Sequence, residues 1–184
     1  MVRGFDAALD LNARTGLPSA LRELVELYPR ATWESHPNFG DLVRFWMQRH
    51  ALFRQLLDVL QTDARARIGG NLDFENYTMR LSHYAGTLVN ELHGHHQIED
   101  HHYFPKLQGL DARVTRGFDL LEKDHEALDG VLHDLANSAN AVLQGGETGV
   151  FLDRLAQFGA VLDRHLTDEE EIIVPVILHT GFRG

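Results

Sequence analysis

Apolar residues recur every three or four positions along most of this chain, which is the period of an amphipathic α-helix. In residues 41–60 the apolar positions are Leu42, Phe45, Trp46, Phe53, Leu56, Leu57 and Leu60. Similar patterns predict further helices from about residue 74 to 103, from about 111 to 143 and from about 148 onward. No segment shows the strict alternation of apolar and polar residues that is typical of a strand. The sequence therefore predicts an all-α protein.

Glycines and prolines separate the predicted helices. Residues 62–73 contain a Gly-Gly-Asn run and few apolar side chains, which predicts a loop. Pro105 predicts the end of the second helix, because proline disfavours the helical conformation in the residue before it. Pro175 predicts an interruption or a kink in the fourth helix. Four long helices joined by short connections predict an antiparallel up-and-down four-helix bundle.

The first 38 residues differ from the rest, since they contain one short amphipathic segment, residues 18–28, followed by a polar stretch. A chain of 184 residues with 43 % hydrophobic content suffices for one domain with a sizeable core. We therefore expect residues 1–38 to form an N-terminal arm with a short helix, and residues 39–184 to form the bundle. We expect the arm to cap one end of the bundle or to line the route into its interior.

Composition narrows the possible chemistry and partners. The chain has no cysteine, so that disulfides, thiolate metal sites and iron–sulfur clusters are excluded, and any metal must be bound by nitrogen and oxygen. The formal charge of −10 disfavours nucleic acid and anionic membranes as partners. The N-terminal region lacks an apolar segment of signal-peptide length, and no run reaches the ~18 apolar residues that span a bilayer. We expect a cytoplasmic protein with no nucleic-acid or membrane partner.

Histidine is unusually frequent, with 12 in the chain and half of them between residues 83 and 102. Offsets of 70 and 75 residues align the two halves of the chain and pair His95 with His165, Glu99 with Glu169, and His50 with His125. Each half thus offers one lone histidine in an apolar stripe and one His-x-x-x-Glu pair. Either feature alone more often belongs to an ordinary core or surface contact. Their repetition at equivalent positions along the helices of both halves indicates one shared site.

A spacing of four residues places the histidine and the glutamate of each pair on the same face of a helix. Such groups in a bundle core must be hydrogen-bonded, paired or metal-bound, because burying them bare costs several kcal/mol. Imidazole and carboxylate ligands suit iron, zinc, copper or manganese. We therefore predict two adjacent metals, one bound by His50 and His95, the other by His125 and His165, with both carboxylates shared, so that the ligands are His50, His95, Glu99, His125, His165 and Glu169.

Two further residues are candidates for supporting roles. His102 lies on the same side of the predicted helix as His95 and could be an additional ligand or a residue that contacts a ligand. Glu91, one turn before His95, could accept a hydrogen bond from its ring N–H, and an ordinary salt bridge is the alternative. The helical wheel places three other histidines on the flank or away from the core: His96, His93 and His101.

These motifs resemble the hemerythrin family, in particular its bacterial HHE cation-binding type. The stretches "RHALFRQLLDVL" and "DHEALDGVL" resemble the lone-histidine helices, and "HHQIEDHHYFPKL" and "HLTDEEEIIVPVIL" resemble the His-x-x-x-Glu helices. The likeness covers about residues 39–178. It implies a hemerythrin-like four-helix bundle that holds two iron ions in a non-heme di-iron centre bridged by two carboxylates. In that family an open coordination position binds dioxygen, and by resemblance the four predicted histidines are terminal ligands and the two glutamates are bridges.

The chain departs from the oxygen-carrying members of the family at two positions. Leu121 stands where those members place a second histidine, four residues before the one that matches His125. One iron would therefore lack its third nitrogen, which His102 could supply. The second bridge is Glu169, where the carriers use an aspartate one residue further along. Both features are similar to divergent HHE proteins with roles in oxygen or iron sensing, nitric oxide response and peroxide handling.

Two other functions stay open from the sequence. The motifs Glu99-x-x-His102 and Glu122-x-x-His125 are typical of ferritin-like di-iron oxidases or peroxidases, although that interpretation leaves the predicted ligands His95 and His165 unexplained. A redox-silent, metal-stabilised interaction module is the third possibility. No phosphate-binding loop and no nucleophile with a base is evident. We expect a metal- and oxygen-binding protein rather than an enzyme, whose ligand is dioxygen or a similar small diatomic molecule or peroxide.

Overall fold

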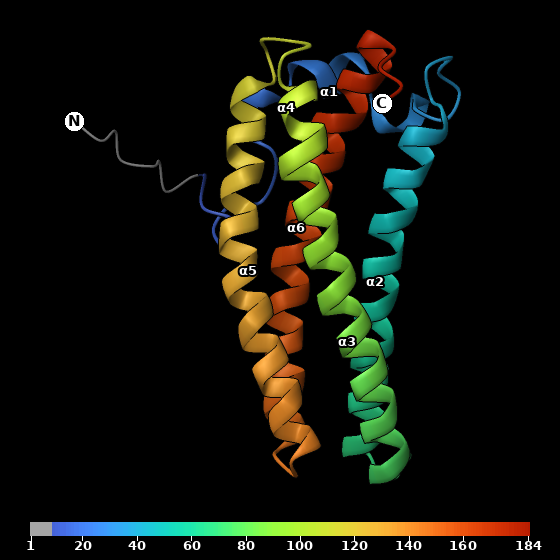
Figure 1. The fold of residues 1–184 in the computed structure, drawn as a ribbon, viewed down its shortest axis with the longest axis vertical. Helices are drawn as coiled ribbons and strands as arrows, with labels where there is room; N and C mark the ends of the chain where they lie inside the picture. The colour runs from blue at the N-terminus through green and yellow to red at the C-terminus, as the bar shows by residue number, and fades with distance from the viewer. Residues whose placement is uncertain (1–8) are drawn as a thin grey trace, which may run out of the picture.

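Four long helices form a bundle in the computed structural model, which describes residues 9–184 (Figure 1). They are α2 (Asp41–Ile68), α3 (Phe74–Ile98), α5 (Thr115–Leu143) and α6 (Thr148–Thr180). Helix α2 packs against α3 and α6, and α5 packs against the same two helices, so that each long helix has two main neighbours. Successive long helices are antiparallel, and no strand occurs among the described residues. The predicted all-α four-helix bundle is confirmed.

The first connection is shorter than the sequence predicts, because α2 continues through residues 62–68. Asp63 in this segment is buried and pairs with Arg80 of α3. The segment therefore retains an inward face and remains helical. The loop covers only residues 69–73, and Asp73 caps α3 by accepting a hydrogen bond from a backbone N–H of its first turn.

The second helical segment does not end at Pro105. After Ile98 the backbone forms one π-helical turn (Glu99–Tyr103) and then the short helix α4 (Phe104–Leu107). Pro105 lies in the first turn of α4, where a missing N–H costs little. The chain then crosses to α5, which begins at Thr115, slightly later than the sequence predicts.

Pro175 does not interrupt α6, which continues to Thr180. All residues from 172 to 178 are buried, and six of these seven are isoleucine, valine or leucine. Their packing outweighs the one backbone hydrogen bond that the proline removes. The helix ends at Gly181, whose positive φ of 70° is a left-handed conformation that closes the last turn.

The buried side chains form two apolar clusters with a polar layer between them. The first apolar cluster includes Phe53, Leu92, Leu128 and Leu162. The second apolar cluster includes Trp46, Phe104, Leu121 and Ile172. Along α2, the segment that begins with α3, and α5, buried histidines lie between the residues of the first and of the second apolar cluster, and along α6 Glu169 lies between them. The polar layer therefore crosses the whole interior.

The chain that precedes α2 forms a 3₁₀ turn (Ser19–Leu21), the short helix α1 (Glu23–Leu27) and a second 3₁₀ turn (Arg30–Thr32). Helix α1 packs against α6 at the end of the bundle where α6 terminates (Figure 1). Leu24 and Trp33 are buried in the second apolar cluster. The arm and its short helix thus pack on the bundle, while a domain boundary between residues 38 and 39 remains a prediction.

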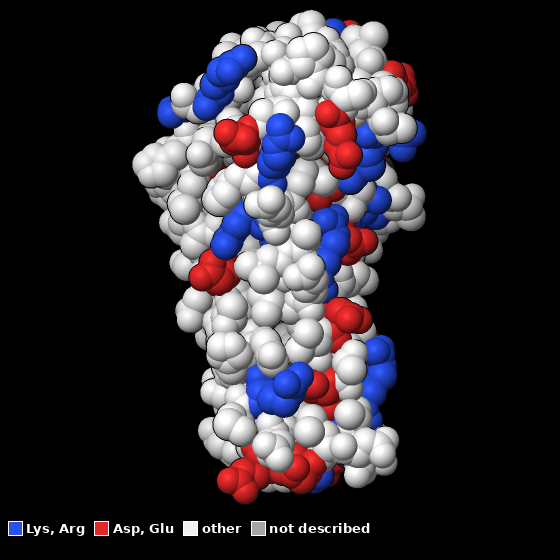
Figure 2. All heavy atoms as spheres, turned by 90° about the vertical axis from the view of Figure 1, so that its right-hand side faces the viewer, with Lys and Arg blue, Asp and Glu red and all other residues white. Residues whose placement is uncertain are grey.

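Charged side chains of both signs are interspersed on the face drawn in Figure 2. The net charge of −10 is therefore not gathered into one acidic patch on that face. Within the described range, no helix has the length and apolar content needed to cross a membrane.

Candidate metal centre

The six residues predicted as ligands meet in the polar layer of the bundle, and each is at most 8 % exposed. They come from α2 (His50), α3 (His95), the π-turn (Glu99), α5 (His125) and α6 (His165 and Glu169). Their nitrogen and oxygen atoms belong to two groups, within each of which the atoms lie no more than 4.8 Å apart. The first ligand group is His50, His95, Glu99 and Glu169, and the second ligand group is His96, His125 and His165.

The two glutamates lie between the histidines of the two halves. Glu99 places Oε1 2.9 Å from Nε2 of His95 and Oε2 3.6 Å from Nε2 of His125. Glu169 places Oε1 3.4 Å from Nε2 of His50 and Oε2 3.4 Å from Nε2 of His165. Each carboxylate therefore directs one oxygen toward each half, which is the arrangement that a carboxylate shared by two metals requires.

His96 is a candidate ligand that the sequence interpretation left on the flank. It is only 2 % exposed, and its ring stacks on that of His125 with centroids 4.0 Å apart. Helix α3 packs between α2 and α5, so that His95 and His96 point toward different neighbours although they are adjacent in sequence. The second ligand group thus has a third nitrogen despite Leu121, and this nitrogen comes from α3 instead of α5.

His102 does not face the core, and the prediction that it does is wrong. It is exposed and lies outside both ligand groups. The π-turn that begins at Glu99 contains more residues per turn than an α-helix, and the helical wheel no longer applies beyond that point. His93 and His101 are exposed, as predicted.

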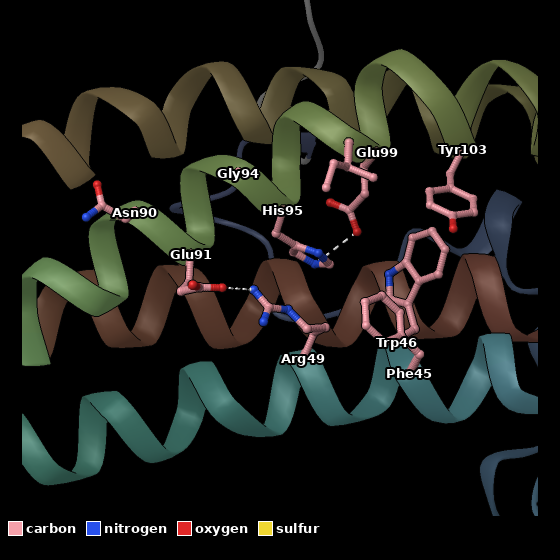
Figure 3. Close-up of a pocket in the computed structure, with 10 residues that line it drawn as sticks. Phe45, Trp46, Arg49, Asn90, Glu91, Gly94, His95, Glu99 and Tyr103 are labelled. Carbon is pink, nitrogen blue, oxygen red and sulfur yellow. Dashed lines mark hydrogen bonds and ion pairs between the residues drawn. The ribbon is translucent and has the colours of Figure 1, made fainter.

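Glu91 also has a different partner from the one considered first. Its carboxylate pairs with Arg49 of α2, and the described contacts of Glu91 do not include His95. The salt bridge, which the sequence left open as the alternative, is therefore the arrangement found. This ion pair spans α2 and α3 beside the ligand groups (Figure 3).

Three carboxylates contact Nδ1 of three candidate ligand histidines and orient their rings. Nδ1 of His50 lies 2.9 Å from Glu170, Nδ1 of His125 lies 2.7 Å from Asp100, and Nδ1 of His165 lies 3.3 Å from Asp124. A hydrogen bond at Nδ1 fixes the ring and leaves Nε2 available, as is usual for metal-binding histidines. Two of these carboxylates carried a signal in the sequence, because an acidic residue directly follows the glutamate in both His-x-x-x-Glu pairs.

The N-terminal arm contributes two arginines to these outer carboxylates. Arg14 is buried, and it donates from Nη1 to Asp124 at 2.9 Å and from Nε to Asp168 at 2.6 Å. Arg30 pairs with Glu170, which also accepts a hydrogen bond from Arg54 of α2. Nothing in the sequence periodicity indicates these contacts, because they join residues that are more than 100 positions apart.

Burial and charge displace the pKa values in the layer. Burial and the charge of Glu169 raise the pKa of Glu99 well above its usual value. Burial alone would also raise the pKa of Glu169, but the charge of His50 and hydrogen bonds to histidines outweigh burial and hold that pKa well below its usual value. Burial lowers the pKa of His95 to about 3. For His165, hydrogen bonds to carboxylates outweigh burial and raise the pKa to about 9. Two adjacent buried carboxylates thus do not both ionise without a cation.

The buried polar atoms that lack a hydrogen-bond partner, in the part of the chain that the structure describes, gather mainly in this layer. They include both ring nitrogens of His96, Nε2 of His125 and of His165, both oxygens of Glu99 and Oε2 of Glu169. Buried polar atoms in proteins are nearly always paired, so that this concentration needs an explanation. Cations placed within the two ligand groups would satisfy these atoms, and nitrogen with carboxylate oxygen is a donor set that iron, zinc and manganese accept.

A family comparison agrees with this geometry. The family model described as Hemerythrin HHE cation binding domain matches residues 41–177, nearly the range over which the sequence resembles that family. No curated protein and no solved structure gives a significant match. The matched range contains both ligand groups and all three carboxylates that orient the histidines.

Proposed function

Because the chain belongs to the hemerythrin HHE cation-binding family, we propose that it is a non-heme di-iron binding protein that binds dioxygen or a related small ligand. The observation that carries the proposal is the position of Glu99 and Glu169, each of which directs one oxygen toward each of two histidine sets. Two carboxylates in this arrangement suit a pair of metals better than a single one.

The proposed assignment gives the two irons unequal numbers of nitrogen ligands. His50 and His95 would bind one iron, His96, His125 and His165 would bind the other, and both glutamates would bridge them. When bound, the iron pair would supply the electrons that dioxygen binding requires. The protein would orient the imidazoles through Glu170, Asp100 and Asp124 and exclude water with the two apolar clusters. The first ligand group, with two histidines instead of three, would leave its iron more room for an external ligand.

The ferritin-like alternative receives less support from the positions of its motifs. His102 and Glu122 are both exposed, so neither Glu-x-x-His motif brings both of its members into the polar layer. The six buried candidates of the proposed centre, in contrast, all point into that layer.

Metal content and the visible spectrum of the same sample test the proposal. The iron-loaded chain is reduced without air and then exposed to air over several cycles. We expect close to two irons per chain and a visible charge-transfer band that appears in air and disappears on reduction. One zinc per chain, or metal without any response to air, would favour a redox-silent interaction module and overturn the proposal.

A further inference from the structure

A cavity of about 390 Å³ lies between α2 and α3, next to the first ligand group (Figure 3). Two candidate ligands, His95 and Glu99, are among the residues that line it. His95 is 8 % exposed, whereas the other six residues of the two ligand groups are at most 3 % exposed. The cavity is therefore the side from which a molecule in solution comes closest to the candidate centre.

The size of this cavity exceeds what a diatomic molecule needs. A water molecule occupies about 30 Å³ in the liquid, so the cavity has room for roughly a dozen of them. Pockets that bind small organic molecules usually measure about 300–1,000 Å³. The volume thus fits a molecule built on a single ring.

The walls of the cavity are mainly aromatic and aliphatic. Trp46 and Tyr103 meet edge to face with centroids 4.8 Å apart. Phe45 and Ile98 also line the cavity, and they remain 55 % and 51 % exposed. Large apolar side chains that stay exposed around one hollow are typical of a ligand site, and aromatic walls favour a ring as the occupant.

The polar groups of the cavity indicate the rest of the ligand. Arg49 and Glu91 pair with each other on one wall and neutralise each other's charge, so this wall has little attraction for a charged molecule (Figure 3). The end next to the candidate centre differs, because His95 and Glu99 line it and the first ligand group has one histidine fewer than the second. A neutral molecule with one oxygen-bearing group directed toward that end satisfies both conditions.

We propose that this cavity binds a small neutral ring compound that carries a hydroxyl group. The ring lies against Phe45 and Trp46, and the hydroxyl points toward His95 and Glu99. This inference rests on the proposed function, since it places an organic ligand beside the proposed iron pair.

Phenol is the probe, and its binding is measured by titration calorimetry with the chain as purified and after loading with iron. We expect an affinity of about millimolar or tighter for this small molecule. Gly94 lines the cavity, and a Cβ added there meets no atom within 4 Å, so we expect the side chain of Gly94→Leu to extend into the cavity. We expect Gly94→Leu to weaken phenol binding at least tenfold.

The matched control is Gly130→Leu, at an exposed glycine of α5 where an added Cβ also meets no atom within 4 Å. It should change phenol affinity less than twofold. Phe45 lines the cavity and is exposed, so Phe45→Ala removes part of the cavity wall and should weaken phenol binding severalfold. This second variant keeps the test valid if Gly94→Leu fails to fold. Benzoate should bind at least tenfold more weakly than phenol, because Arg49 is already paired with Glu91 and does not neutralise the carboxylate of benzoate.

The outcomes separate this inference from the proposed function. Two irons per chain with no heat of phenol binding would overturn the inference alone. Phenol binding that Gly94→Leu blocks, in a chain that takes up no iron when it is loaded, would overturn the proposed function alone. Equal phenol affinities in wild type, Gly94→Leu and Phe45→Ala, or equal affinities for phenol and benzoate, would overturn the inference as stated.

Discussion

Arg14 of the N-terminal arm donates a hydrogen bond to Asp124 at 2.9 Å, and the same carboxylate lies 3.3 Å from Nδ1 of His165. The arm is therefore separated from a candidate ligand by a single side chain. Arg30 stands in the same relation to His50 through Glu170. Packing of the arm on the bundle is thus connected to the orientation of a histidine in each half of the site.

Replacement of Arg14 by alanine should destabilise the chain and weaken metal binding. It leaves Asp124 without its arginine in a buried setting, and we expect a loss of about 3 kcal/mol in the free energy of unfolding. Looser orientation of His165 should weaken iron affinity by roughly tenfold. Denaturant unfolding and metal retention after dialysis measure the two effects.

Arg44→Ala is the control for Arg14→Ala, because Arg44 is exposed and contacts Asp41 and the ring of Phe39 but no buried carboxylate. Its effect should stay within about 0.5 kcal/mol. An unfolding midpoint of Arg14→Ala equal to that of wild type would show that the arm contact does not matter for stability.

His96→Ala should reduce the metal content from two ions per chain toward one. The substitution removes one of three nitrogens from the second ligand group, and loss of a ligand lowers metal affinity far more than loss of a surface histidine. His93→Ala, on the exposed side of the same helix, should keep both metals. Elemental analysis after gel filtration is the measurement, and two firmly held irons in His96→Ala would exclude His96 as a ligand.

Glu99→Ala and Glu169→Ala should each abolish the two-metal centre. Each substitution removes the oxygen directed at one histidine set together with the oxygen directed at the other. Glu122→Ala, at an exposed carboxylate of α5, should leave the metal content unchanged. Retention of two irons in either of the first two variants would refute the bridging assignment.

Asp111 should contribute stability that disappears in acid. A side-chain hydrogen bond from Arg113 is the main reason that the pKa of Asp111 is lowered from 3.8 to about 2. A carboxylate whose pKa is lowered by folding stabilises the fold at any pH above its pKa in the unfolded chain, about 3.9. This contribution is lost as the pH falls through the pKa of the folded chain. Wild type should therefore be more stable than Asp111→Asn at pH 5, and the difference should shrink between about pH 4 and pH 2.

Denaturant unfolding of both proteins across this pH range tests the expectation for Asp111. The control is Asp58→Asn, at an exposed position of α2. A difference between wild type and Asp111→Asn that stays constant from pH 5 to pH 2 would contradict the assigned pair.

The helical period was sufficient to predict most of the bundle and to bring six candidate ligands into one layer. His95 and Glu99 share a face because four residues nearly complete a turn, and the same holds for His165 and Glu169. The two prolines did not mark helix ends as the sequence analysis predicted. Pro105 lies in a first helical turn, where it is tolerated, and Pro175 lies among buried apolar residues whose packing holds α6 together.

The remainder of the site depends on tertiary relations that one helix does not contain. Whether His96 is buried depends on the position of α3 between α2 and α5, and a helical wheel drawn from His95 alone leaves that position out. The orientation of His102 depends on a π-turn, for which the local sequence gave no recognised signal. Arg14 reaches Asp124 across 110 positions of the chain, so that only the folded arm brings the two together.

The polar layer between the two apolar clusters bears on the cooperativity of unfolding. Each of the four helical segments crosses that layer once, and the groups inside it satisfy one another poorly without a cation. The two clusters of an iron-free chain are therefore coupled weakly, and calorimetry should record a broad or two-step transition. Ions bound by residues from every long helix would join the clusters into one unit, so that the loaded chain melts in a single sharp step.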